Sequence, residues 1–190
     1  MRLLLTGASI IARNEGKEEP HINWNLKKML PDVEIENTAV SGINSGAFFA
    51  RLNELVLSVK KCDNLVILLG TNDLATHKQV PLTQFKQNME LICSAIICAY
   101  YPPHVLLVSP PAVDEEKQLV RDNALVEKYA KAVEEVAQEY HFRYADLCQA
   151  MLDAGDIKKT AQGMKNDGLH FGDAGYEILA KLIVKNLKSM

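Results

Sequence analysis

The sequence predicts an α/β protein, a three-layer α/β/α sandwich built on a five-stranded parallel sheet. Short apolar runs such as residues 3–5 and 65–69 are typical of strands that are buried on both faces of such a sheet. These runs alternate with longer stretches in which apolar residues recur at the spacing of amphipathic helices. Small and polar residues follow the runs directly, as expected where parallel strands end at the edge that binds ligands.

The bulk composition predicts one domain over residues 1–190, with 48% hydrophobic and 24% charged residues and no sign of disorder. A net charge of −3 without a basic cluster disfavours nucleic acid and stable membrane association. The four cysteines form no Cys-x-x-Cys pair, so we expect buried free thiols, no metal and a cytoplasmic protein. No cofactor is expected, and the composition does not indicate an oligomeric state.

The first third of the chain predicts two strands and two helices. In chain order we expect a strand over 3–5, an exposed loop over 10–23, a helix over 23–30, a strand over 33–38 and a helix over about 44–59.

The rest of the chain continues the alternation. It predicts a strand over 65–69, a helix over 83–100, a strand over 105–108, a helix over 118–140, a strand over 142–144, a loop up to residue 170 and a last helix from about 173. The crossovers are expected to be right-handed, and we predict the flavodoxin-like strand order 2-1-3-4-5.

Five polar or small residues are expected to meet at one edge of this sheet. Ser9, Gly42 and Asn72 each follow the end of one of the first three strands, and Asp167 and His170 precede the last helix. A serine nucleophile needs a base, and the base needs an acceptor that fixes its tautomer, so Ser9, His170 and Asp167 predict a catalytic triad. The Ser9 N–H, the Gly42 N–H and the Asn72 amide can supply an oxyanion hole.

At these positions the chain resembles the SGNH (GDSL-type) hydrolases. The matching blocks, in chain order, are Gly7-Ala8-Ser9-Ile10, Ala39-Val40-Ser41-Gly42, Gly70-Thr71-Asn72-Asp73 and Asp167-Gly168-Leu169-His170. The resemblance implies a serine esterase or acylhydrolase that cleaves acyl or acetyl esters or thioesters of small molecules through an acyl-enzyme. Two departures stand out: Ala8 replaces the aspartate of the first block, and Ala39 or Val40 stands where the second block often has glycine.

Other interpretations of the first block are weaker. Residues 4–9 also resemble the opening of the short-chain dehydrogenases, but Ile10, Ile11 and Ala12 stand where a dinucleotide loop needs glycine. None of the six tyrosines has a lysine four residues later, as that family requires. No Gly-x-Ser-x-Gly elbow of an α/β-hydrolase occurs. A non-catalytic descendant that binds a ligand or partner is the main alternative.

Each candidate residue also has a structural explanation. Ser9 and His170 can cap helices, Asp167 can close a turn, and Gly42 can serve a turn only. Of the two polar residues that follow the third strand, we expect Asn72 to be functional and Asp73 to be structural. Trp24 is expected to be a packing residue.

Overall fold

The computed structural model describes residues 1–188 and contains one parallel sheet of five strands. The strands are β1 (Arg2–Gly7), β2 (Glu34–Asn37), β3 (Asn64–Leu68), β4 (Val105–Val108) and β5 (Arg143–Ala145). Their order in the sheet is β2-β1-β3-β4-β5, which confirms the predicted order. Leu5 of β1 lies in register with Asn37 of β2 on one side and Val66 of β3 on the other. Because all strands are parallel, their carboxyl ends share one edge.

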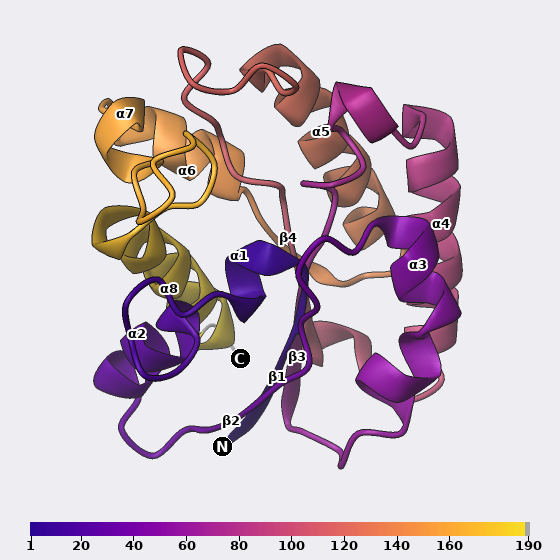
Figure 1. Ribbon diagram of the computed structural model, residues 1–190. Helices are drawn as coiled ribbons and strands as arrows, with labels where there is room; N and C mark the ends of the chain where they lie inside the picture. The colour runs from indigo at the N-terminus through magenta and orange to yellow at the C-terminus, as the bar shows by residue number, and fades with distance from the viewer. Residues whose placement is uncertain (189–190) are drawn as a thin grey trace.

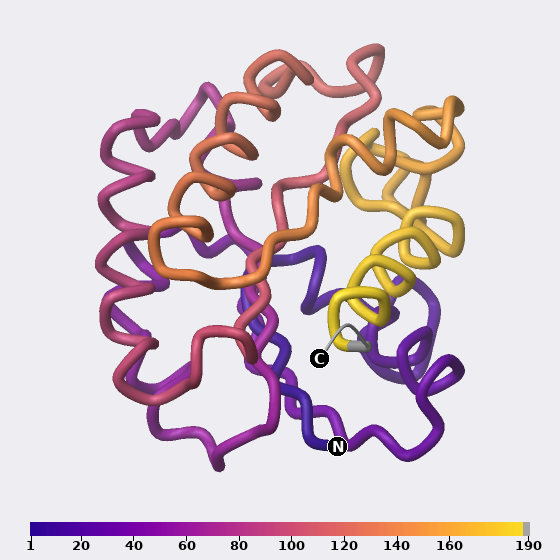
Figure 2. The backbone as a smooth tube through the Cα atoms, turned by 180° about the vertical axis from the view of Figure 1, so that it is seen from behind, coloured from indigo at the N-terminus to yellow at the C-terminus, as the bar shows by residue number. Residues whose placement is uncertain are grey.

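Helices cover both faces of the sheet, so the predicted three-layer sandwich is confirmed. The α-helices are α1 (Ser9–Ala12), α2 (His21–Met29), α3 (Ser45–Ala50), α4 (Leu82–Ile96), α5 (Asn123–Glu139), α6 (Leu147–Asp153), α7 (Ile157–Thr160) and α8 (Asp173–Lys188). A π-helix η1 (Asn53–Leu57) and the 3₁₀ turns η2 (Thr76–Lys78) and η3 (Pro102–His104) complete the described elements. Figure 1 shows α2, α6, α7 and α8 on one side of the sheet and α3, α4 and α5 on the other, and the reverse view agrees (Figure 2).

The core forms because the central strands are apolar on both faces. All five residues of β3 are buried. On one face the ring of Phe85 in α4 lies 4.9 Å from that of Tyr129 in α5, and on the other Phe171 lies 4.7 Å from Tyr176 in α8. Aromatic pairs at such separations add to the free energy that burial of their area contributes.

Several expected boundaries were wrong. The stretch 10–23, expected to be an exposed loop, contains α1 and the start of α2, and Ile10 and Ile11 are fully buried. The helix expected over 44–59 is divided into α3 and the π-helix η1. The loop expected before residue 170 contains α6 and α7, whose N-caps Asp146 and Asp156 accept backbone hydrogen bonds.

One boundary affects the function. The helix expected over 118–140 begins at Asn123, because the carboxylate of Asp122 accepts the Leu125 N–H at 2.7 Å and caps α5. Upstream, the Val120 carbonyl accepts the Thr76 N–H at 3.0 Å instead of a helical donor. Residues 114–122 therefore form a connection that starts with one turn, in which the Asp114 carbonyl accepts the Lys117 and Gln118 N–H groups, and that is not part of α5.

Two further observations concern the cysteines and the membrane. Cys62, Cys93 and Cys148 are buried free thiols as expected, whereas Cys98 is exposed, contrary to the expectation. Among the helices of residues 1–188, none is both long and apolar enough to cross a membrane.

Gly7 should be intolerant of any side chain, because β1 ends against β3 at this point. Its φ is +138°, and a Cβ there would lie 2.1 Å from the Leu68 carbonyl oxygen. We expect Gly7→Ala to lower the free energy of unfolding by about 3 kcal/mol through backbone strain and overpacking. Gly155→Ala is the matched control, since the φ of Gly155 is +80° but a Cβ there would have nothing within 4 Å. It should lower the free energy of unfolding by about 1 kcal/mol. Urea unfolding that gives equal losses would contradict this account.

Candidate active site

Ser9 stands where β1 turns into α1. Ala8 is the N-cap of that helix, and its N–H donates to the Leu68 carbonyl of β3 at 3.3 Å. From the other side, the Tyr176 hydroxyl donates to the Ile10 carbonyl at 2.8 Å. The Ser9 side chain is thus carried on a turn that both the sheet and α8 fix in place.

The structure brings Ser9, His170 and Asp167 together in the predicted arrangement. Ser9 Oγ lies 2.9 Å from His170 Nε2, and His170 Nδ1 lies 2.7 Å from Asp167 Oδ2. Asp167 Oδ1 accepts the backbone N–H groups of Leu169 at 3.0 Å and His170 at 2.9 Å. Because the carboxylate faces Nδ1, that nitrogen carries the proton and Nε2 is left to accept from the serine hydroxyl.

The electrostatics suit this arrangement. Burial lowers the pKa of His170, and the neighbouring Asp167 carboxylate raises it without fully offsetting the effect. Burial by itself raises the pKa of Asp167, but the hydrogen bonds from His170 and Leu169 outweigh it and hold this pKa below its usual value. Near neutral pH the imidazole is therefore an unprotonated base beside an ionised carboxylate.

Gly42 and Asn72 lie on segments that are attached to the end of β1, which carries Ser9. The turn over 40–43 is attached to the end of β1, because the Val40 N–H donates to the Gly7 carbonyl at 2.9 Å. Asn72 Nδ2 donates to the Ile43 carbonyl at 2.9 Å, which connects the end of β3 to the same turn. Gly42 has a φ of +84°. An amide nitrogen has two hydrogens, so Asn72 keeps one for a ligand.

A model of the GDSL-like lipase/acylhydrolase family matches residues 5–178. The chain belongs to this family. It is similar to a GDSL esterase/lipase of Arabidopsis thaliana, with 27% identity over 142 residues that cover 65% of this chain and 58% of the relative. It is also similar to a probable rhamnogalacturonan acetylesterase of Bacillus subtilis, with 26% identity over 180 residues that cover 87% and 82%.

Among solved structures, the lipase/acylhydrolase of Enterococcus faecalis superposes with a TM-score of 0.87 and 27% identity, covering 99% of this chain and 95% of that one. The chain spans only about half the length of the first curated relatives it matches, namely 58%, 38% and 54%. Membership in the GDSL-like family agrees with the parallel sheet in the order β2-β1-β3-β4-β5.

Ala8, the residue of the first block that departs from the pattern, is fully buried within the hydrophobic core. No side chain caps the first turn of α1. An aspartate introduced here would gain a cap position and lose solvation, since burial of a carboxylate is costly.

Asp73 has the structural role expected of it. Its fully buried carboxylate accepts the Ser45 N–H at 2.8 Å and the Ser45 hydroxyl at 2.5 Å. Asn88 Nδ2 donates to the same hydroxyl at 2.9 Å. Burial raises the pKa of Asp73, and the Ser45 hydrogen bonds lower it. This network joins α3, α4 and the end of β3 behind Asn72.

Glu15 was not among the candidate residues. Its buried carboxylate accepts the Met164 N–H at 2.7 Å and pairs with Arg13. The contact attaches the loop that carries Asp167 to the segment after α1. A glutamate in an apparently polar loop carries no local signal of such a contact, because its partner is 149 residues away.

Gln118 and Arg121 were likewise missed. Gln118 Nε2 donates to the Asp167 carbonyl at 2.5 Å, and the Asp114 N–H donates to the Gly168 carbonyl at 2.8 Å. Arg121 Nε donates to the Thr71 carbonyl at 2.9 Å. The connection over residues 114–121 therefore contacts both the backbone before Asn72 and the loop that carries Asp167.

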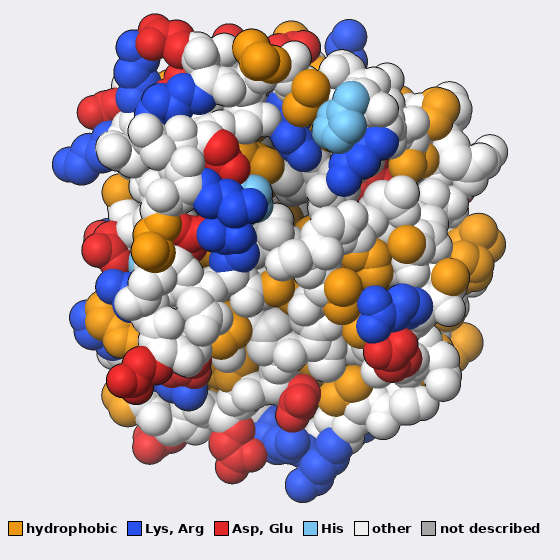
Figure 3. Space-filling view, in the orientation of Figure 1, with side chains coloured by type: hydrophobic (Ala, Val, Ile, Leu, Met, Phe, Trp, Pro, Cys, Tyr) orange, Lys and Arg blue, Asp and Glu red, His pale blue; other side chains and the backbone are white. Residues whose placement is uncertain are grey.

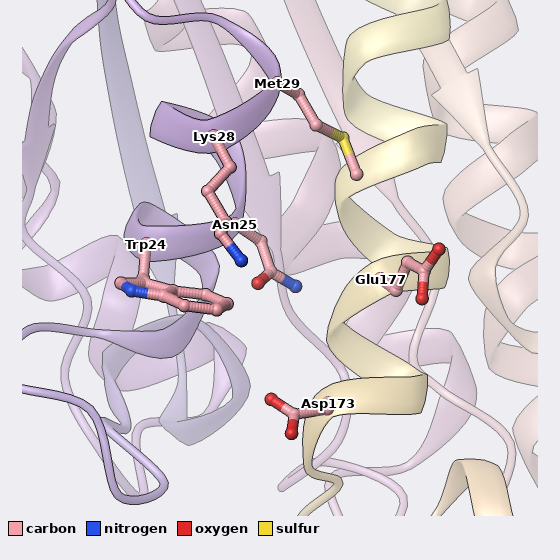
Figure 4. A pocket seen from close by; sticks show the side chains of 6 residues that line it. All are labelled: Trp24, Asn25, Lys28, Met29, Asp173 and Glu177. Carbon is pink, nitrogen blue, oxygen red and sulfur yellow. The ribbon is translucent and has the colours of Figure 1, made fainter.

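Trp24 lines a separate cleft of about 410 Å³ between α2 and α8. Figure 4 shows its lining, and no triad residue is part of it. The Trp24 ring has the ammonium groups of Lys17 and Lys28 at 4.3 Å and 3.7 Å from its centroid. The indole thus contacts two cations of the protein itself.

Proposed function

We propose that this protein hydrolyses carboxylic esters through an acyl-enzyme formed on Ser9. The observation that carries the proposal is the continuous hydrogen-bonded arrangement from Ser9 Oγ to His170 Nε2 and from His170 Nδ1 to Asp167, at 2.9 Å and 2.7 Å. These distances suit proton transfer from a serine hydroxyl to an imidazole that a carboxylate orients.

The reaction has two halves. Ser9 Oγ attacks the carbonyl carbon while His170 Nε2 takes the hydroxyl proton, and the carbonyl oxygen becomes an oxyanion. The Ser9 N–H, the Gly42 N–H and the Asn72 amide donate to it. Collapse expels the alcohol, or the thiol of a thioester, with the proton from His170. Water then attacks the acyl-enzyme with His170 as base, and the acid leaves.

The proposed substrates are acyl or acetyl esters of small molecules. The acetylesterase among the relatives and the lipase/acylhydrolase among the structures support an acyl-transfer reaction. The proposed mechanism uses only side chains, backbone N–H groups and water. That the protein needs no cofactor stays a prediction.

A screen of aryl esters of increasing chain length tests the proposal. We expect release of the phenol with a short-acyl ester and, after rapid acid quench, a mass increase of one acyl group on the peptide that contains Ser9. A folded protein with neither turnover nor acylation would favour the non-catalytic alternative.

The pH dependence follows from the His170 environment. Because burial lowers the pKa of His170, kcat/KM should rise with pH through a midpoint below the usual value of about 6.5. Asp167→Asn removes the carboxylate that raises this pKa, so the midpoint should move lower still. Its kcat should fall, because the Asn amide would face Nδ1 and favour the wrong tautomer.

The measurement is kcat/KM from pH 4 to 9 for both proteins, with unfolding curves as a control. A midpoint that moves upward in Asp167→Asn would contradict the assigned partner, because loss of a neighbouring negative charge cannot favour the protonated imidazole.

A further inference from the structure

Arg121 lies between the two halves of the candidate site. Its Nε donates to the Thr71 carbonyl at 2.9 Å, directly before Asn72. Its Nη1 donates to Gln118 Oε1 at 2.9 Å, and Gln118 in turn donates to the Asp167 carbonyl. The guanidinium is thereby bonded directly to the backbone before Asn72 and, through the Gln118 side chain, to the backbone of Asp167.

One nitrogen of this guanidinium makes no hydrogen bond within the described residues. Within residues 1–188, Arg121 Nη2 has no hydrogen-bond partner and the side chain forms no ion pair. Three other arginines each pair with a glutamate: Arg2 with Glu34, Arg13 with Glu15 and Arg51 with Glu54. Arg143 donates to the Asn186 carbonyl instead. Arg121 is half-buried, and burial lowers its pKa while the Asp167 charge raises it. A guanidinium nevertheless stays charged at neutral pH.

A half-buried cation without an acidic partner favours an anionic ligand, since buried charges are normally paired. Two hydrogen bonds to neutral oxygens already fix the plane of the guanidinium, so little side-chain entropy remains to be lost when an anion binds. Nη2 and the second hydrogen of Nη1 form the planar fork that matches the two oxygens of a carboxylate.

The surrounding charges agree with this. The positive charges of Arg13 and Lys165 lower the pKa of His170, so these two cations also act on the candidate site. Lys165 is exposed and Arg13 is paired with Glu15, which leaves Arg121 as the fixed, unpaired cation of this group. Figure 3 shows Lys and Arg side chains in the upper half of this face, with Asp and Glu side chains among them and further Lys and Arg at its lower edge.

We propose that Arg121 binds a carboxylate carried by the substrate, so that the preferred substrates are esters with an anionic group in the acyl or the alcohol part. This inference rests on the proposed esterase function. Arg121 is then a specificity-determining residue, and the connection over 114–121 is the element that presents it.

Matched pairs of esters separate this role from a structural one. Monoethyl succinate and ethyl succinamate differ only in an acyl-side carboxylate or amide, and O-acetylglycolate and O-acetylglycolamide differ in the same way on the alcohol side. Acid release in a pH-stat gives kcat/KM for each. We expect the wild-type protein to prefer the carboxylate by about tenfold or more in at least one pair, as one charge-assisted contact allows.

Arg121→Gln should reduce this preference to about unity, because it lowers kcat/KM on the carboxylate esters more than on the amide esters. Arg121→Lys keeps the charge without the fork and should retain part of the preference. The control is Lys117→Gln, which removes one positive charge from the same connection. Lys117 Nζ already donates to Asn166 Oδ1 at 2.6 Å. It should keep the full preference.

A binding measurement keeps the test independent of turnover. In the Ser9→Ala background, monoethyl succinate or O-acetylglycolate should raise the unfolding temperature more than its amide does, and adding Arg121→Gln should abolish the difference. Equal responses to carboxylate and amide, in turnover and in binding, would overturn the inference while leaving the esterase proposal standing. An equal fall of kcat on every ester in Arg121→Gln, with the preference unchanged, would assign Arg121 a purely structural role.

Discussion

Ser9→Ala is expected to lower kcat by about 10⁴-fold or more, because a residue that acts within a triad removes the whole nucleophilic step when it is lost. The Ser9 hydroxyl is the atom that lies against His170 Nε2 at 2.9 Å, and the substitution removes nothing else. The fold should persist, since the contacts that fix α1 come from Ala8 and Ile10. The measurement is kcat on a short aryl ester, with thermal unfolding alongside.

The double variant makes this test sharper. Ser9→Ala with His170→Ala should be little worse than either single change, because both residues serve the same step. Losses that multiply would mean that the two residues act independently. Ser41→Ala is a suitable control, since this exposed hydroxyl lies one residue before Gly42 and has no place in the proposed chemistry.

Asn72→Ala is expected to lower kcat by about 10²–10³-fold with a much smaller effect on KM, as for one lost oxyanion-hole donor. The reason is that an oxyanion donor binds the transition state more strongly than the ground-state carbonyl. The same substitution removes the 2.9 Å hydrogen bond to the Ile43 carbonyl, so some loss of unfolding free energy should accompany it.

The split between kcat and KM separates these two effects. Asn72→Asp keeps the shape of the side chain but removes the donors and adds a negative charge near the oxyanion, so it should be at least as slow as Asn72→Ala. A variant that unfolds earlier yet keeps its kcat would show that Asn72 is structural only.

The sequence by itself determined the layers and predicted which residues meet at the candidate site. The runs at Leu3–Leu5 and Leu65–Leu69 identify buried parallel strands, because only strands covered on both faces can be apolar at every position. The short blocks after those strands then place Ser9, Gly42 and Asn72 at one edge. Asp167 and His170 were predictable as a pair because their spacing of three residues lets one turn bring both side chains together.

Only the tertiary structure decided what surrounds those residues. Periodicity extended the helix back to residue 118, but Asp122 caps α5 and Arg121 donates to a carbonyl 50 residues away. Glu15 likewise meets Met164 from the opposite end of the chain. Local patterns report which face of an element is apolar, whereas contacts between distant segments depend on the packing of the whole chain. Such contacts place Arg121 between the end of β3 and the loop that carries Asp167.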